Sequence, residues 1–255
     1  MLAQGRADRP TNVVEFLFDA DRWTAEGGIL DQAWITAQHS LAALAVAVAV
    51  AIPVAVLLAH YRRAELLASW LVNIGRAIPT VAIVGIMVIV SLRQGWGFTP
   101  WPIVLALVLL ALPPLFTNTY TAVRGVDPGA VSSARAMGLR ERGVMFRVEL
   151  PLALPIALTG LRTAAVQILA TEPLGAFFGG EGLGAYVRQG LANDNLVQVQ
   201  AGAVLVTGLA ILTDVGLFGL TRLLIPRGVR RSTVPTDRRR PVTDLDPVLD
   251  TVPSP

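Results

Sequence analysis

Five apolar stretches place the strongest constraint on what this chain can fold into. Each is close to or above the length of about 20 residues that a helix needs to cross the hydrocarbon core of a bilayer. They cover residues 40–59, 64–92, 102–121, 152–178 and 196–225. A segment in lipid must satisfy its backbone hydrogen bonds internally, so runs of this length predict helices. With 15% charged residues, the chain is predicted to be an all-α membrane protein with about five transmembrane helices.

Composition excludes several kinds of chemistry. The sequence has no cysteine, which excludes disulfides, thiolate catalysis and cysteine metal sites. All 21 basic residues are arginine, so neither a P-loop lysine nor a Schiff-base lysine is available. The two histidines, His39 and His60, stand at opposite ends of the first predicted span. We therefore predict no catalytic residue, no metal and no cofactor in this chain.

The second predicted span contains a proline and an arginine. Pro79 removes a backbone hydrogen bond, so the helix is expected to break there. Arg76 lies shortly before this break. Its side chain is expected either to reach the cytoplasmic surface or to line the translocation path.

Two acidic residues lie in the last two spans. An acidic side chain inside a membrane is costly unless it has a partner, so Asp214 is predicted to have one. That partner would lie at a helix–helix contact or gate, or would be the solute. Glu172 lies late in the fourth span. It would either sit near the outer surface, where the cost is small, or attract a cationic ammonium group.

A glycine-rich sequence, GGEGLG at residues 179–184, follows the fourth span. Glycine permits sharp reversals and close approach of the backbone. The sequence is therefore either a loose turn or a hinge or gate at the outer mouth. The residues that we predict as a possible pathway or gate are Arg76, Pro79, Glu172, Gly180, Gly182, Gly184 and Asp214.

Residues 127–151 form a polar, arginine-rich island between the third and fourth spans. Asp127 followed by Pro128 is a helix-start signal, and Gly138 can end that helix in a left-handed conformation. Val131, Ala134 and Met137 fall on one side of this helix. A second short helix over residues 140–149 is expected to stop before Pro151.

The distribution of arginine predicts the orientation of the chain. Arg62, Arg63, the arginines of the island and those that follow the fifth span all fall on one side, which the positive-inside rule makes cytoplasmic. The N-terminus is then outside and the C-terminus inside. We divide the chain into an extracytoplasmic N-terminal segment (1–39), a transmembrane domain (40–226) and a disordered cytoplasmic tail (227–255).

The island resembles the cytoplasmic loop motif of ABC importer permeases. Ser132-Ser133-Ala134 stands at the place of the usual Glu-Ala-Ala, Gly138 at the glycine, and Leu150-Pro151 at the final Leu-Pro. The sequence therefore has Ser132 where the family has glutamate. Three further stretches are similar to permeases for glycine betaine, carnitine and choline: NIGRAIPT at residues 73–80, NTYTAV at 118–123, and GGEGLG. Glu172-Pro173 departs from the small polar residues usual in that part of the fourth span.

The resemblance implies a MetI-like fold in which residues 127–151, here called the coupling segment, form a coupling-helix pair. This pair would seat in a groove of a separate ATP-binding subunit, so the chain would not itself be an enzyme. Two permease subunits, identical or paralogous, would enclose the pathway, and an extracytoplasmic binding protein would deliver the solute. Met137, Leu139, Val144 and Phe146 would fill the groove. The residues implied in coupling are Ser132, Ser133, Ala134, Arg135, Met137, Gly138, Leu139, Phe146 and Pro151.

Three alternatives remain open on the sequence. The first keeps the importer but changes the solute to an amino acid or another small polar molecule. The second is a membrane-embedded enzyme, although the spans lack the dense set of His, Asp, Glu or Ser residues that such chemistry needs. The third is a passive channel, which would need no ATP-binding partner.

Overall fold

Every regular element that the structure describes is a helix. The computed structural model describes residues 10, 12–62, 79–97 and 99–224. In chain order the elements are α1 (Val13–Phe18), α2 (Ala20–Thr24), α3 (Ile29–His60), α5 (Thr80–Arg93), α6 (Trp101–Arg124), α7 (Pro128–Ala136), α8 (Glu141–Val144), the π-helical turn η2 (Met145–Glu149), α9 (Leu150–Thr171), the 3₁₀ helix η3 (Glu172–Phe178), α10 (Gly184–Ala192) and α11 (Leu196–Leu224). The predicted all-α class is confirmed.

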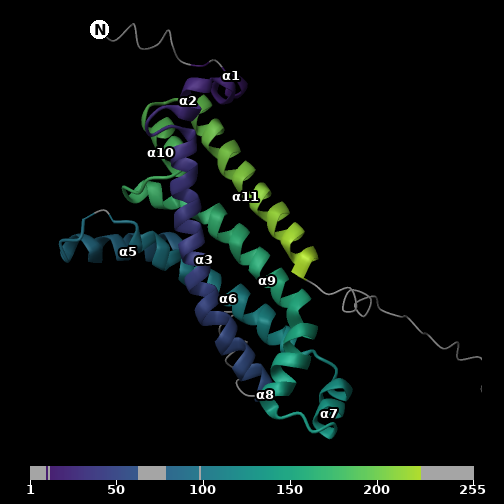
Figure 1. Cartoon of the computed structure of the whole chain (residues 1–255). Helices are drawn as coiled ribbons and strands as arrows, with labels where there is room; N and C mark the ends of the chain where they lie inside the picture. Colours follow the sequence, from purple (N-terminus) through teal and green to yellow (C-terminus); the bar gives the residue numbers. More distant parts are fainter. Residues whose placement is uncertain (1–9, 11, 63–78, 98, 225–255) are drawn as a thin grey trace, which may run out of the picture.

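Four helices in the described residues are long and apolar enough to cross a membrane. They are α3, α6, the continuous helical run Glu141–Phe178 that contains α9, and α11. Figure 1 shows α3, α9 and α11 running along the long axis of the molecule, whereas α5 lies to one side of α3 and runs at a steep angle to it. The predicted span over 64–92 is represented by α5, which begins at Thr80 directly after Pro79. Arg76 lies outside the described residues.

The contact between α3 and α6 is built on small residues. Ala43, Ala47, Ala51, Ala55 and Ala59 recur at every fourth position of α3, and each is at most 2% exposed. This spacing places them on one face of the helix. Small side chains let two helix backbones approach closely, which is how helices associate when lipid offers no hydrophobic driving force. This alanine face belongs to the main core, which α6 and α9 complete.

The two prolines inside α6 do not end the helix. Pro113 and Pro114 lie within the continuous span Trp101–Arg124. Side chains one turn later bond back to this region: Thr117 Oγ1 donates to the carbonyl of Pro113 at 2.7 Å, and Asn118 Nδ2 donates to that of Pro114 at 2.8 Å. These bonds give a further donor to the carbonyls of the prolines themselves, whereas the carbonyls that lose their usual donors are those of Leu109 and Leu110, four residues earlier.

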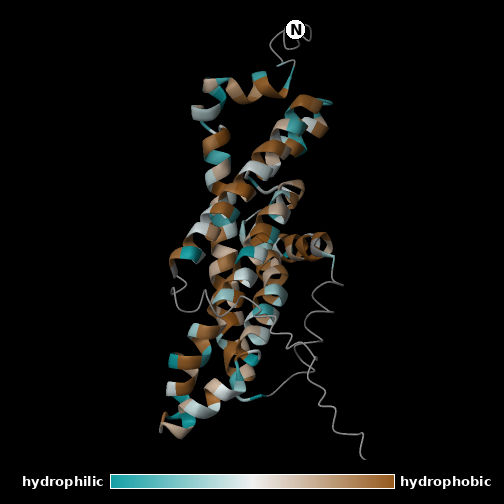
Figure 2. Cartoon of the chain, turned by 90° about the vertical axis from the view of Figure 1, so that its right-hand side faces the viewer, coloured by the Kyte–Doolittle hydropathy of each residue, from teal (hydrophilic) through white to brown (hydrophobic). Residues whose placement is uncertain are grey.

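The N-terminal segment and the coupling segment lie at opposite ends of the molecule. In Figure 1, α1, α2 and α10 are grouped at the end where α3 begins, and α7 and α8 are at the end where α3 finishes. Figure 2 shows hydrophobic residues along the long helices and hydrophilic residues at both ends. The boundary that we drew at residue 39 falls inside α3, because the N-terminal lead-in and the first span form one helix of 32 residues.

Candidate functional site

The first helix of the coupling segment forms as its sequence predicts. The backbone N–H of Gly129 donates to Asp127 Oδ1 at 3.0 Å, and Pro128 is the first residue of α7. At the other end, Gly138 has a φ of 85°. The N–H of Gly138 bonds to the carbonyl of Arg135 at 2.9 Å, and that of Leu139 bonds to the carbonyl of Ala134 at 3.2 Å. These two bonds form a Schellman motif, in which glycine is preferred at the left-handed position.

The prediction that the second helix stops before Pro151 is wrong. α8 continues through the π-helical turn η2 into α9, and Pro151 lies in the first turn of α9. Proline removes a backbone donor and crowds the carbonyl four residues earlier. The wider π-helical turn comes directly before it and accommodates this disruption. As a result, the coupling segment joins α9 without an intervening loop.

The structure divides the predicted coupling residues into two groups. Met137 is 75% exposed and Phe146 is 59% exposed, so both can contact another protein. Ser132, Ser133, Arg135 and Gly138 are also exposed, whereas Leu139 and Pro151 are partly buried. Ala134 is 2% exposed and Val144 is fully buried. Val144 is therefore a core residue of this chain and does not project from it, because the face of so short a helix is not fixed by its sequence alone.

Ionic contacts fix α7 to α8. Arg135 donates to both carboxylate oxygens of Glu141, from Nε at 2.9 Å and from Nη2 at 3.0 Å. This two-point geometry is favourable for a guanidinium and a carboxylate. The side-chain hydrogen bonds to Glu141 raise the pKa of Arg135, so its charge is retained. Arg135 is thus engaged within its own segment, where it orients α7.

The end of α3 contacts the same segment through His60. Nδ1 of His60 lies 2.5 Å from Glu149 Oε2, and Nε2 lies 3.4 Å from Glu141 Oε2. Both His60 and Glu149 are buried, at 8% and 6% exposure. No role for His60 follows from the sequence, because a partner so distant in the sequence leaves no local signal.

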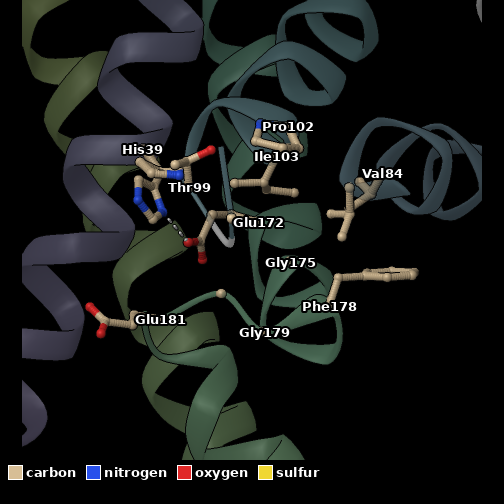
Figure 3. Close-up of a pocket in the computed structure, with 14 residues that line it drawn as sticks. His39, Val84, Thr99, Pro102, Ile103, Glu172, Gly175, Phe178, Gly179 and Glu181 are labelled. Atoms are coloured by element: carbon tan, nitrogen blue, oxygen red, sulfur yellow. Dashed lines mark hydrogen bonds and ion pairs between the residues drawn. The ribbon is translucent and has the colours of Figure 1, made fainter. Parts of the chain in front are cut away.

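At the end of α9 that is far from the coupling segment, Glu172 is buried and contacts two side chains of α3. It is 1% exposed, so its carboxylate is enclosed by this chain, and its position near the outer surface of the membrane stays a prediction. Its Oε1 lies 3.0 Å from His39 Nδ1, and its Oε2 accepts a hydrogen bond from Thr36 Oγ1 at 3.0 Å. Figure 3 shows the contact with His39. Glu172 is the first residue of η3, and its side chain reaches α3 through these two contacts.

The glycine-rich sequence is fixed to α3 by two further hydrogen bonds. The N–H of Gly182 donates to Gln32 Oε1 at 2.7 Å, and that of Leu183 donates to Thr36 Oγ1 at 2.8 Å. Gly182 has a φ of 103°, and a Cβ there would lie 2.6 Å from Thr36 Oγ1. A loose turn does not describe this loop, since its backbone is held by a buried side chain. A role as a hinge or gate stays a prediction.

A pocket of about 250 Å³ lies beside this polar cluster. Its wall combines His39, Glu172 and Thr99 with apolar side chains of α5, α6 and η3, among them Val84 and Ile103 (Figure 3). Of the predicted pathway residues, Glu172 and Gly180 line this pocket. Pro79, Gly182, Gly184 and Asp214 are not among its lining residues, so this pocket does not bring all the predicted residues together.

Asp214 has the polar partner that the sequence analysis predicted. Arg162 of α9 donates from Nε to Asp214 Oδ1 at 3.0 Å and from Nη2 to Oδ2 at 2.8 Å. The guanidinium also lies 4.9 Å from the centre of the Phe218 ring. The two charged side chains are 29% and 39% exposed. The sequence predicts that Asp214 needs a partner but does not identify Arg162, although Arg162 is the basic residue in the preceding span.

The chain was compared with known families and relatives. Residues 51–230 match the family described as binding-protein-dependent transport system inner membrane component. The carnitine transport permease protein OpuCD of Listeria monocytogenes is 31% identical over 217 residues, which cover 85% of this chain and 92% of that protein. The choline transport system permease protein OpuBB of Bacillus subtilis is 33% identical, covering 86% of this chain and 97% of that protein. The osmoprotectant import permease protein OsmW of Salmonella typhimurium is 32% identical, covering 78% of this chain and 94% of that protein.

Solved structures share the fold. An inward-facing conformation of the MetNI methionine ABC transporter superimposes with a TM-score of 0.68 at 22% identity, covering 78% of this chain and 96% of that one. An amino acid ABC transporter with histidines superimposes with a TM-score of 0.61 at 14% identity, covering 88% of this chain and all of that one. At these identities the likeness concerns the fold alone.

Proposed function

This chain belongs to the family of binding-protein-dependent transport system inner membrane components, and we propose that it imports osmoprotectants such as glycine betaine, carnitine and choline. As a membrane permease of an ABC importer it is not itself the enzyme, so ATP hydrolysis takes place on a partner subunit. The solute class is supported by relatives named for carnitine, choline and osmoprotectant transport, which align over most of this chain.

The observation that carries the proposal is the exposed surface of the coupling segment. Met137 and Phe146 project from a segment that joins α9 directly and contacts the end of α3 through His60. An apolar side chain exposed next to charged ones is suited to bind a partner protein rather than to face water. Here the partner is the ATP-binding subunit. Rigid attachment to two long helices lets its movement reach the membrane domain.

We place the remaining parts of the transporter around this surface. The coupling segment and the C-terminus are cytoplasmic, as the arginine distribution indicates, and the N-terminus is outside. A solute-binding protein then docks at the end that carries α1, α2 and α10. A second permease, identical or paralogous, completes the pathway. The residues proposed to line or gate it are Arg76, Pro79, Glu172, Gly180, Gly182, Gly184 and Asp214.

Uptake by the assembled transporter in proteoliposomes tests this function. Import of radiolabelled choline or glycine betaine should require ATP and the binding protein. An excess of unlabelled carnitine should compete with this import. Methionine should not compete, since the likeness to the methionine transporter is one of fold alone. Competition by an amino acid with no effect of any osmoprotectant would favour the other solute class. Solute flux that needs no ATP would favour a passive channel.

A further inference from the structure

The two histidines of this chain pair with glutamates at the two ends of one helix. Glu149 directly precedes α9 and contacts His60, and Glu172 directly follows α9 and contacts His39. His39 and His60 both belong to α3. We call His39–Glu172 the outer pair and His60–Glu149 the inner pair. α3 and α9 are therefore antiparallel and are joined at both ends by the same two residue types.

We propose that the outer and inner pairs make α3 and α9 a single rigid body during transport, so that movement of the coupling segment reaches the glycine-rich loop. The four side chains are positioning residues in this scheme. The inference rests on the proposed function, because it assigns a mechanical role within the same importer.

The spacing of the pairs fits two helices that run side by side. At about 1.5 Å per residue, the two histidines are about 32 Å apart along α3, and the two glutamates are about 34 Å apart along the α9 segment. Similar separations allow both contacts to form at once without bending either helix. Between the pairs, α3 and α9 pack into the same core.

Burial makes the two side chains of each pair costly to separate. Glu149 and Glu172 are 6% and 1% exposed, and a buried carboxylate needs hydrogen-bond partners to remain there. Sliding of α3 along α9 would separate both pairs at once and leave both carboxylates without their histidines. The helices are thus expected to keep their register.

The atoms at each end connect this body to the functional parts. At the inner end His60 also approaches Glu141, which binds Arg135 of α7. At the outer end Thr36, which donates to Glu172, also accepts from the N–H of Leu183 in the glycine-rich loop. A displacement of the coupling segment therefore moves the loop without passing through a flexible connection.

The rigidity can be measured directly, because the chain has no cysteine of its own. Spin labels would be attached to Val50→Cys on α3 and Ile156→Cys on α9, two positions that are 50% and 47% exposed. In the assembled transporter, the distance between the labels should be the same with and without ATP, while ATP hydrolysis in the same sample shows that nucleotide is used. A distance that changes when ATP is added would overturn the proposal.

The mechanical role predicts how variants behave. His39→Ala and His60→Ala should each lower the solute imported per ATP hydrolysed by about tenfold, a change within the range seen for residues of a coupling network. The double variant should be no worse than the poorer single one, because the same connection is broken twice. His39→Gln, which can still hydrogen-bond to Glu172, should keep the ratio. Gln38→Ala, at an exposed neighbouring position, is the matched control.

Two results would contradict the role of the pairs. If the variants lower the amount of assembled transporter but leave the import-to-hydrolysis ratio unchanged, the pairs are merely structural. If the losses multiply in the double variant, the two ends act independently. Absence of osmoprotectant import by the unaltered transporter would instead count against the proposed function.

Discussion

Replacing Gly138 by arginine is expected to abolish ATP-dependent uptake while the protein still inserts into the membrane. Gly138 is exposed and has a φ of 85°, a conformation that costs other L-residues about 1–2 kcal/mol. A Cβ at this position would meet nothing within 4 Å in this chain. A larger side chain therefore meets a modest backbone strain but no steric clash within this chain, and the severe effect arises at the partner. A long cation beside Met137 would keep the ATP-binding subunit from seating.

The control for this variant is Gly138→Asn. Asparagine tolerates the left-handed conformation better than other residues and is much shorter than arginine, so most uptake should remain. Uptake is measured in membrane vesicles, and insertion is measured by the amount of protein in the washed membrane. Normal uptake by Gly138→Arg would refute the role of this surface in docking.

Breaking the Arg162–Asp214 pair is expected to have the second-largest effect. Arg162→Ala leaves the Asp214 carboxylate in a membrane-spanning helix without the guanidinium that donates to both of its oxygens. An unpaired charge at the centre of a transmembrane helix costs about 2.5–3.5 kcal/mol. We expect a loss of stability of about 1–3 kcal/mol, the upper part of the range that is usual for single substitutions.

A double-mutant cycle in lipid nanodiscs measures this contribution. Arg162→Ala and Asp214→Ala should each lower the unfolding temperature, and the double variant should recover most of the loss because no unpaired charge remains. Thr163→Ala, at an exposed position next to Arg162, is the control. Losses that simply add in the double variant would show that the pair is not coupled.

Local features were the part of this fold that could be predicted from the sequence. The start of α7 at Asp127 and Pro128 and its end at Gly138 depend on the capping of neighbouring backbone groups. The start of α5 after Pro79 has a similarly local cause. The long spans follow from the length of apolar runs, which is set by the thickness of a bilayer.

Contacts between distant residues could not be predicted in the same way. His39, His60, Glu149 and Glu172 each carry an ordinary local sequence, and their pairing depends on how α3 packs along α9. The burial of Val144 has a related cause, since it depends on how α8 packs into the main core. The π-helical turn η2, through which the helix continues past Pro151, also differs from the expectation that the helix stops before this proline.

Cross-linking from Met137 shows directly whether the coupling segment docks on an ATP-binding subunit in the cytoplasm. The chain has no cysteine, so Met137→Cys provides a single reactive site on the exposed surface. Val144→Cys is the matched control, because Val144 is fully buried in the same segment. We expect a cross-link between Met137→Cys and the ATP-binding subunit, and none from Val144→Cys. Labelling of Met137→Cys by an impermeant reagent from outside the cell, with no cross-link to that subunit, would contradict this docking.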